Sequence, residues 1–410
     1  MSPLKAVTLV LSALITVCYA YQAIYLFLPL FVKNKSKKTE QHRRYAILIA
    51  ARNEEAVLPQ LLRSIQMQDY PAHLVTTYVV ADNCTDQTAQ VAARSGAVVI
   101  TRTNTQQVGK GYALQYLLQQ IDTACHDAFL IFDADNLLAP DYIRKLDQAW
   151  TGDYDAFCGY RNSKNLATNW VSAGHGLWYL HDSIHLSRSR HIVGVPCAVT
   201  GTGFGFTRNL LERMNGWHFF TLTEDIEFSV WCATRGIRIG YCHDAVLYDE
   251  QPETVRQSFR QRIRWTQGTF QISCRYAKDM FRGLFRGGKI APASLEALTL
   301  SLWGYLLGIT CSILGFTSSI LSYGWLGAVH WLLTAIAGLY LTGILVGALT
   351  VISERRRIRA TRKQRLMAVF AFPLYLLTYI PIFVAAIFRK RRWTPIDHKH
   401  VLSSEEFSKL

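Results

Sequence analysis

The chain has 410 residues, 50% of them hydrophobic, and a formal net charge of +15 at pH 7. This length allows two or three domains, so the distribution of the apolar residues must decide the architecture. The basic residues gather beside long apolar runs and form no stripe interleaved with aromatic residues, which argues against nucleic acid as a partner and favours a lipid bilayer. The nine cysteines are scattered and odd in number and include no C-x-x-C pair, so they suit a reducing cytoplasm and need no chemical role.

The first apolar run covers residues 6–32 and contains no charged residue. About 20 helical residues cross a hydrocarbon core about 30 Å thick, so this run predicts a transmembrane helix. A cleavable signal peptide would have a shorter apolar region and a small-residue cleavage site. Lys and Arg residues at positions 33–44 follow the run instead, and they predict that this end of the helix lies in the cytoplasm.

Residues 45–253 have ordinary polarity and predict a cytoplasmic α/β domain. Short apolar runs predict strands at 45–50, 76–81, 98–101 and 128–132, with helices at 54–68, 86–94 and 111–121 between them. Strands that alternate with helices imply a parallel sheet covered on both faces. In such sheets ligands bind beyond the carboxyl ends of the strands.

Carboxylates follow three of these predicted strands. Glu54 follows the first strand, Asp82 the second, and Asp133 and Asp135 the fourth. One such residue is often only a helix cap or a turn former, but several in one crevice repel one another unless a cation or a ligand compensates. In an extended segment Asp133 and Asp135 point the same way, and their oxygens suit a Mg²⁺ or Mn²⁺ ion that also holds a diphosphate.

Two other patterns are weaker indications of function. His175, His181, His185 and His191 lack the Glu of a zinc-protease motif, so they are interpreted as residues of a partly exposed helix rather than as a metal cluster. Residues 109–111 are Gly-Lys-Gly, without the upstream glycine and the following Ser or Thr of a phosphate-binding loop.

The last third of the chain alternates amphipathic and apolar stretches. Residues 254–290 predict amphipathic interfacial helices, in which Arg262 is interpreted as lying on lipid head groups. Residues 293–352 predict a transmembrane hairpin with its turn near Ser322 and Tyr323. Residues 366–388 contain two prolines and have basic residues on both sides, so they either cross the membrane or form a re-entrant segment. The positive-inside tendency favours a cytoplasmic tail at 389–410.

Four segments of the α/β region, in this order, resemble family 2 of the glycosyltransferases. They are Ala51-Arg52-Asn53-Glu54-Glu55, Val80-Ala81-Asp82-Asn83-Cys84-Thr85-Asp86, Gly109-Lys110-Gly111 and Asp133-Ala134-Asp135. Thr223-Glu224-Asp225 and Gln261-Arg262-Ile263-Arg264-Trp265 resemble the two signatures of its processive members, which include cellulose, chitin and hyaluronan synthases and nodulation-type chitin oligosaccharide synthases. The resemblance covers about residues 45–286. Ala50 and Ala51 depart from it, because the family usually has a proline-containing turn there.

The resemblance implies an A-type glycosyltransferase domain, with a nucleotide-binding mixed sheet, attached to transmembrane helices. It implies that Glu54 and Asp82 hold the uridine part of a UDP-sugar donor and that Lys110 lies near the base or ribose. It also implies that Asp133 and Asp135 meet the nucleotide and the Mn²⁺ or Mg²⁺ ion that bridges its diphosphate, with Asp135 as the metal ligand.

The two processive signatures imply the catalytic and acceptor residues. Asp225, with Glu224 beside it, is expected as the general base that takes a proton from the acceptor hydroxyl. Arg264 is expected to stabilise the departing diphosphate together with the metal, and Gln261 belongs to the same signature. Trp265 is expected to stack on the acceptor sugar.

One further segment, Gly201-Thr202-Gly203, resembles the acceptor loop of the family, where glycines let a sugar approach the backbone closely.

These residues imply an inverting, metal-dependent and processive polysaccharide synthase in the plasma membrane, with a glycan acceptor and a cytoplasmic catalytic domain. One alternative is the transfer of a single sugar to a lipid carrier or glycolipid, although relatives of the dolichol-phosphate type lack the Gln-x-x-Arg-Trp element. A transporter is the other alternative. Its transport path would require ionisable residues inside the apolar runs, which contain almost none.

Overall fold

A single mixed sheet organises the catalytic domain. The computed structural model describes residues 3–32, 41–150 and 152–389, and within them eight strands pair in the order β3-β2-β1-β4-β7-β6-β8-β5. The strands are β1 Tyr45–Ala51, β2 Val75–Asp82, β3 Val98–Arg102, β4 Ala128–Asp133, β5 Leu137–Leu138, β6 Ala156–Ser163, β7 Phe204–Thr207 and β8 Ile239–Asp249. Strands β1 to β4 are parallel, while β7 runs antiparallel to its neighbours β4 and β6. The predicted α/β class with a mixed sheet is confirmed.

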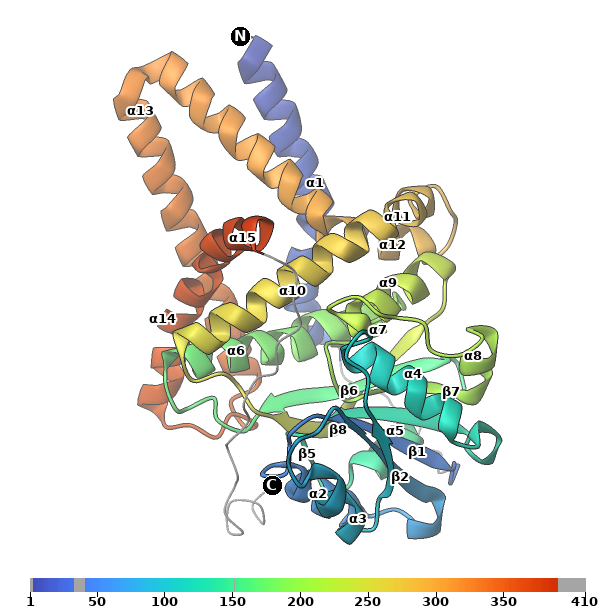
Figure 1. The fold of residues 1–410 in the computed structure, drawn as a ribbon. Coiled ribbons are helices and arrows are strands. Elements are labelled where there is room, and N and C mark those ends of the chain that lie inside the picture. Colours follow the sequence, from blue (N-terminus) through green and yellow to red (C-terminus); the bar gives the residue numbers. More distant parts are fainter. Residues whose placement is uncertain (1–2, 33–40, 151, 390–410) are drawn as a thin grey trace.

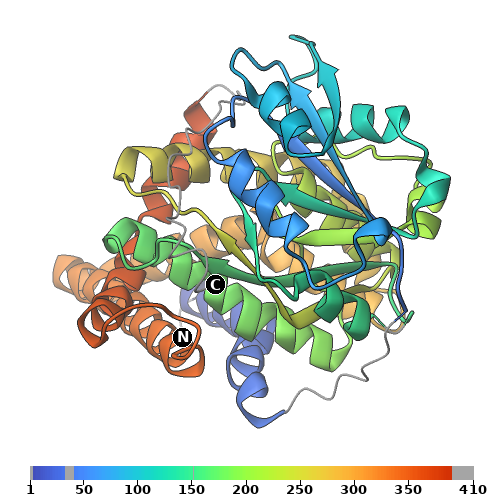
Figure 2. The same cartoon turned by 90° about the horizontal axis from the view of Figure 1, so that it is seen from below.

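Helices cover both faces of this sheet (Figure 2). They are α2 Leu58–Gln66, α3 Thr88–Arg94, α4 Lys110–Gln120, α5 Tyr142–Ala149, α6 Trp170–His181, α7 Arg188–Val193, α8 Arg208–Arg213 and α9 Glu224–Arg235. Alternate strand residues enter different cores because side chains along a strand point to opposite faces. Ile47 packs with residues of α2 and α5, whereas Leu48 packs with residues of α4, α6 and α9.

The register brings the carboxyl ends of the central strands together. Ala51 of β1 lies opposite Ala81 of β2, and Ala50 lies opposite Asp133 of β4. All four strands predicted in this half are present within a residue or two of their expected bounds. The helix expected from residue 54 begins only at Leu58, because Pro59 lacks an N–H donor and is tolerated only in the first turn.

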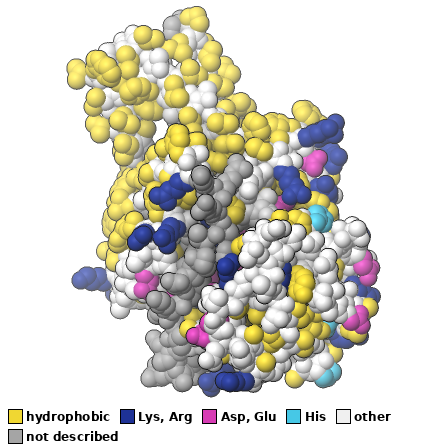
Figure 3. Space-filling model, viewed as in Figure 1, with side chains coloured by type: hydrophobic (Ala, Val, Ile, Leu, Met, Phe, Trp, Pro, Cys, Tyr) yellow, Lys and Arg dark blue, Asp and Glu magenta, His cyan; other side chains and the backbone are white. Residues whose placement is uncertain are grey.

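The remaining helices lie on one side of this domain (Figure 1). They are α1 Pro3–Phe31, α10 Val255–Arg275, α11 Ala277–Gly283, α12 Ile290–Thr299, α13 Leu302–Ser353, α14 Arg362–Leu377 and α15 Tyr379–Phe388. Within the described ranges, three helical segments are long and apolar enough to cross a membrane: Pro3–Phe31, Leu302–Ser353 and Arg362–Phe388. Helix α10 runs between the sheet domain and these segments. Hydrophobic side chains cover the projecting part of the molecule (Figure 3).

Helix α13 is a hairpin with two arms. Gly324 has φ 64° and ψ −160°, which breaks the helix, and the arms diverge from that point (Figure 1). The turn was expected two residues earlier. The first arm begins at Leu302, where the Ser301 side chain accepts from the N–H of Trp303, and not at position 293 as expected. Residues 293–299 belong to α12, which packs on α9 and carries the buried Glu296.

Helices α14 and α15 do not form one straight segment. The chain bends at Thr378, and α15 returns to α10, where Ile382 packs against Ile263 and Phe270. The side-chain amide of Gln267 on α10 donates to the carbonyls of Ala386 (3.1 Å) and Arg389 (3.0 Å). The chain at position 389 is therefore back beside the catalytic domain. The expected tail beyond Arg389 and the basic residues 33–40 lie outside the described residues.

Candidate active site

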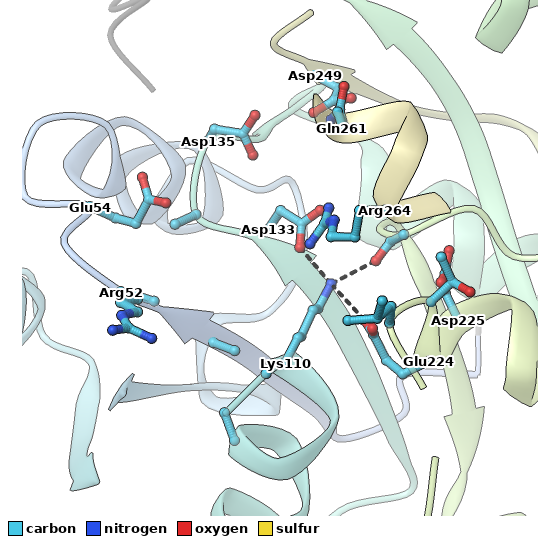
Figure 4. Close-up of a pocket in the computed structure, with 18 of the residues that line it drawn as sticks. Arg52, Glu54, Lys110, Asp133, Asp135, Glu224, Asp225, Asp249, Gln261 and Arg264 are labelled. Atoms are coloured by element: carbon cyan, nitrogen blue, oxygen red, sulfur yellow. Dashed lines mark hydrogen bonds and ion pairs between the residues drawn. The ribbon is translucent and has the colours of Figure 1, made fainter. Parts of the chain in front are cut away.

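An open pocket lies at the carboxyl ends of β1, β2 and β4, where α9 and α10 meet the sheet (Figure 4). Among the side chains and backbone that line it are Glu54, Asp82, Lys110, Asp133, Asp135, Gly201, Glu224, Asp225, Gln261, Arg264 and Trp265. All the residues expected at the site are therefore together except Thr202 and Gly203, which lie behind its wall.

Asp82 and Glu54 occupy the side of the pocket formed by the loops after β1 and β2. Asp82 is buried, and its Oδ1 accepts from Arg102 Nη1 (2.6 Å) and from the amide of Asn83 (3.0 Å). Glu54 follows β1, and its N–H donates to Thr88 Oγ1 (2.8 Å). The ion pair with Arg102 keeps the Asp82 carboxylate in one orientation, which suits a group that accepts hydrogen bonds from a ligand.

Asp133 and Asp135 reach the same pocket from a strand end and a turn. The expectation of an extended segment is wrong, because the N–H of Asn136 donates to the carbonyl of Asp133 (3.1 Å) and closes a turn. The Asn136 amide also donates to Asp249 Oδ1 (3.2 Å) and lies 3.4 Å from Asp135 Oδ1. Thr202 Oγ1 accepts from the N–H of Asp133 (3.0 Å) and donates to Asn136, so it supports the turn from behind.

Lys110 lies among these carboxylates. Its ammonium donates to Asp133 Oδ1 (2.5 Å) and to the carbonyl of Gly201 (2.6 Å), and it lies 4.0 Å from Glu224 Oε1. Burial alone would lower the pKa of Lys110, but the charges of Asp133 and Glu224 raise it above its ordinary value. These contacts put the ammonium in the carboxylate cluster, and its expected place near the base or ribose of a donor stays a prediction.

Glu224 and Asp225 form the first turn of α9, and both are buried. Burial, followed by the neighbouring charge of Asp225, raises the pKa of Glu224 to about 7. Burial also raises the pKa of Asp225, against the hydrogen bond from the N–H of Ile226 and the charge of Lys110. A proton acceptor with a raised pKa is a stronger base, as general base catalysis requires.

Gly201 brings the predicted acceptor loop beside two of these carboxylates. Its φ of +91° favours glycine, and a Cβ there would lie 3.8 Å from Asp133 Oδ2 and 3.9 Å from Asp225 Oδ2. Gly203 is required for a different reason, because a Cβ there would overlap the side chain of Leu247. The loop therefore runs between the end of β4 and the start of α9 in a conformation that favours glycine.

One face of α10 closes the pocket. Arg264 and Trp265 follow Gln261 by three and four residues, so all three side chains line this face. The buried Gln261 Oε1 and Arg264 Nε have no hydrogen-bond partner within the described residues. Near-perpendicular ring contacts with His175 (5.9 Å) and Tyr179 (6.3 Å) hold the indole of Trp265 against α6.

Arg262 faces the other way, and its interpretation as a head-group residue is wrong. It is 3% exposed, and its Nη1 donates to the carbonyl of Tyr375 (3.0 Å). Its guanidinium also lies over the rings of Tyr375 (4.3 Å) and Tyr379 (4.9 Å). The helical period turns this residue away from Gln261 and Arg264 and towards α14, so it joins helices instead of binding lipid.

Three charged residues that line the pocket were missed from the sequence: Arg161, Asp249 and Glu250. Arg161 Nε donates to Asp249 Oδ2 (2.9 Å), and its Nη1 donates to the carbonyl of Thr200 in the acceptor loop. Asp249 ends β8, so the rule that drew attention to Asp82 and Asp133 would have found it. No sequence pattern marks Arg161, because its role depends on β6 pairing beside β8.

The carboxylate ligands in the pocket suit a divalent cation. The described residues contain no group of three His, Cys, Asp or Glu side chains arranged to hold one. Asp133 and Asp135 supply hard carboxylate oxygens to one pocket. Mg²⁺ is often held by one or two carboxylates together with substrate phosphates, so two protein carboxylates are sufficient when a diphosphate completes the shell.

The parallel half of the sheet, its acidic strand ends and the α9–α10 cover define an A-type glycosyltransferase domain. The chain belongs to the glycosyltransferase-like family 2, whose model matches residues 42–268. It is therefore a glycosyltransferase, as its motifs predict.

Several curated relatives are similar over much of the chain. A probable glycosyltransferase, YdaM of Bacillus subtilis, is 24% identical over 88% of this chain and 85% of its own length. A β-monoglucosyldiacylglycerol synthase of Synechocystis is 24% identical over 65% of this chain, but the match spans only 58% of that enzyme. The poly-β-1,6-N-acetyl-D-glucosamine synthase of Staphylococcus epidermidis is 24% identical over 72% of this chain and 70% of its own length.

A solved structure supports the fold. The mannosyltransferase PcManGT of Pyrobaculum calidifontis, in complex with GDP-Man and Mn²⁺, aligns with a TM-score of 0.60. The alignment covers 93% of this chain and 99% of that one, at 18% identity. The likeness therefore includes the apolar helices as well as the sheet domain.

Proposed function

We propose that this protein transfers a sugar from a UDP-linked donor, with inversion and with Mn²⁺ or Mg²⁺, to a growing polysaccharide at the cytoplasmic face of the plasma membrane. One observation carries the proposal. A single pocket unites the paired carboxylates Asp133 and Asp135, the buried base candidate Asp225, and the exposed part of Trp265 on the helix that borders the apolar segments.

The donor would bind along the carboxyl ends of the strands. Asp82 and Glu54 would accept hydrogen bonds from the nucleoside, and Asp133 and Asp135 would hold the divalent ion. That ion supplies positive charge to the diphosphate when it is bound. Lys110 and Arg264 lie in the same pocket, and their cationic groups would stabilise the negative charge that develops on the leaving diphosphate.

The transfer would take place between Asp133 and Asp225. An acceptor hydroxyl would give its proton to Asp225 as its oxygen bonds to the anomeric carbon and the bond to the diphosphate oxygen breaks. Attack from the face opposite the leaving group inverts the anomeric configuration. Glu224 has a pKa of about 7, so it would exchange protons with its surroundings near neutral pH. It would not contact the acceptor, because its carboxylate faces Lys110.

The helices suggest how the catalytic domain faces the cytoplasm. We propose that α1 and both arms of α13 cross the membrane and that α14 and α15 form a re-entrant segment. The contact between Gln267 and the carbonyl of Arg389 supports this topology, because it returns the chain to the side of the catalytic domain. Arg43, Arg44, the basic residues at 355–365 and Arg389 would then all lie on the cytoplasmic side.

A second candidate is the transfer of a single sugar to a membrane lipid. The cyanobacterial relatives named β-monoglucosyldiacylglycerol synthase favour it, as does an apolar cavity beside Asp225. The two candidates share donor, metal and base, and they differ in the number of sugars that each acceptor receives.

The donor can be identified directly. Purified protein in nanodiscs, incubated with a panel of nucleotide sugars and Mn²⁺, should release nucleotide from one UDP-sugar far faster than from the others. Release from GDP-linked sugars alone would contradict the proposed donor class. No release from any donor, with or without an acceptor, would contradict the whole proposal.

A further inference from the structure

A second cavity, of about 190 Å³, lies between α9, α10 and α12. Its wall is mainly apolar and includes Ile226, Val230, Ile272, Met280 and Ala297. None of these residues belongs to the donor site. An apolar cavity of this kind gains free energy when hydrocarbon replaces water in it.

Three segments of the chain border both this cavity and the active-site pocket. On α9, Ile226 lines the cavity and the preceding Asp225 lines the pocket; on α10, Thr269 lies one turn after Trp265. The loop before Gly201 contributes Ala198 to the cavity. Ser229 Oγ, inside the cavity, donates to the carbonyl of Asp225. The cavity is therefore a neighbour of the catalytic carboxylate along α9, α10 and the acceptor loop.

The cavity also adjoins the apolar helices. Leu300 and Ser301 line it, and α13 begins at the next residue, Leu302. Leu300 is 45% exposed, so an apolar side chain stands at the rim. On the other side, α12 contacts α1 through the hydroxyl of Tyr25, which donates to Glu296 (2.5 Å). The cavity therefore lies beside the first residue of α13 and next to a helix, α12, that contacts α1.

The charged groups on the cavity wall neutralise each other. Arg190 Nε donates to Glu296 Oε2 (2.7 Å), and both side chains are buried. The buried Nη1 of Arg190 has no hydrogen-bond partner within the part of the chain that the structure describes. An unpaired buried donor is costly, and an ester oxygen of a lipid would satisfy it.

We propose that this cavity holds a hydrocarbon chain of a hydroxyl-bearing membrane lipid, whose hydroxyl reaches Asp225 as the first acceptor. The inference rests on the proposed function and names its acceptor class. A hydroxyl is favoured over a phosphate because Asp225 is a buried base, and a lipid phosphate is already ionised at neutral pH. The hydroxyl proton passes to Asp225, the lipid oxygen bonds to the anomeric carbon, and the nucleoside diphosphate leaves.

The test uses substitutions that fill the cavity and compares sugar transfer to different lipids. Ala297 lines it, so Ala297→Val, Ala297→Leu and Ala297→Phe should reduce its room in steps. Ala291→Phe, on the same helix but not in the cavity wall, is the matched control. The proteins are assayed in phosphatidylcholine nanodiscs that contain diacylglycerol, polyprenyl phosphate or neither lipid, with the donor that the panel identifies.

The wild-type protein should attach sugar to diacylglycerol and not to polyprenyl phosphate. Ala297→Phe should lower this product about tenfold or more. If the added ring displaces two methylene groups of the lipid chain from the cavity, the affinity for the lipid alone falls roughly tenfold. Hydrolysis of the donor should stay unchanged in every variant, which shows that the catalytic pocket is intact.

A photoreactive group on one acyl chain of diacylglycerol gives an independent measurement. Peptides of α9 and α12 should be labelled in the wild type, and less in Ala297→Phe than in Ala291→Phe. Labelling confined to α1 and α13, equal products from both phenylalanine variants, or transfer only to polyprenyl phosphate would overturn the inference while leaving the proposed function intact. Failure of donor hydrolysis in the wild type would instead overturn the function itself.

Discussion

A Cβ atom on Gly268 would lie 2.2 Å from Oγ1 of Thr223, so α10 touches the residue immediately before Glu224 and Asp225, the proposed catalytic pair on α9. Gly268 lies one turn beyond Arg264 on the face that closes the pocket. The position of Trp265 relative to Asp225 is therefore set by a contact that only glycine permits.

Gly268→Ala should move α10 away from α9 and reduce sugar transfer. Added volume in a packed contact costs about 1–3 kcal/mol, part of it as displacement of the helix. Thr223→Ala removes Oγ1 and Cγ2, the two closest atoms, so the double variant should recover much of the lost transfer. Transfer rates of the two single variants and the double variant measure the coupling. Additive losses would show that the contact does not position the site.

Asp225→Asn tests the base. It should still bind the nucleotide, whose contacts lie on the strand ends, while transfer falls about 10²-fold or more. Nucleotide affinity from calorimetry, beside a single-turnover transfer rate, separates the two effects. Collapse of nucleotide affinity would show that Asp225 belongs to the donor site.

The pH dependence of transfer also tests Asp225 as the base, because burial raises the pKa of its carboxyl. A base must be ionised, so transfer should be lost as pH falls through the raised pKa of Asp225, above the ordinary Asp value of about 3.9. Glu224, with a pKa of about 7, is already protonated over that range, so Glu224→Gln should leave the acid limb in place. A clear shift of the acid limb in Glu224→Gln would contradict this order of titration.

Asp135→Asn tests the metal. The amide keeps the shape of the side chain but removes the charge, so turnover should be abolished while the melting temperature changes little. Wild-type activity should vanish in chelator and return with Mn²⁺ or Mg²⁺. Full activity of the wild type in chelator would rule out a metal-dependent mechanism.

Arg262 and Arg264 lie on the same helix but face opposite ways, so Met substitutions at the two positions can be compared directly. Arg262→Met removes a buried hydrogen bond from α10 to α14 and ring contacts from α10 to Tyr375 of α14 and Tyr379 of α15, so it should lower the melting temperature by several degrees. Arg264→Met should leave the melting temperature nearly unchanged and reduce transfer, because its guanidinium faces the pocket. The reverse pattern would contradict the orientation of α10.

The strands and their acidic ends could be predicted because local patterns determine them. Short apolar runs followed by Asp82 or Asp133 are visible without tertiary information. The parts that could not be predicted depend on long-range packing. Arg262 was assigned to the lipid surface because the sequence does not show Tyr375 approaching it, and Arg161 had no local signal at all. The start of α13 was misplaced because residues 293–299 are apolar enough for a membrane, yet they pack on α9.

Trp265→Ala tests the proposed acceptor role of this residue. Its ring is held edgewise by His175 and Tyr179 at the border between the pocket and α6. A sugar stacked on this ring would lose its contact when the ring is removed. Trp265→Ala should therefore shorten or abolish polymer, while hydrolysis of the donor survives.

The most direct test is the size distribution of the product that the wild-type protein makes from radiolabelled donor in nanodiscs. The proposed function predicts a ladder of products many sugars long, which contracts to short species in Trp265→Ala. A wild-type product one sugar long, unchanged in length by Trp265→Ala, would contradict polysaccharide synthesis even if the donor, the metal and Asp225 are all assigned correctly.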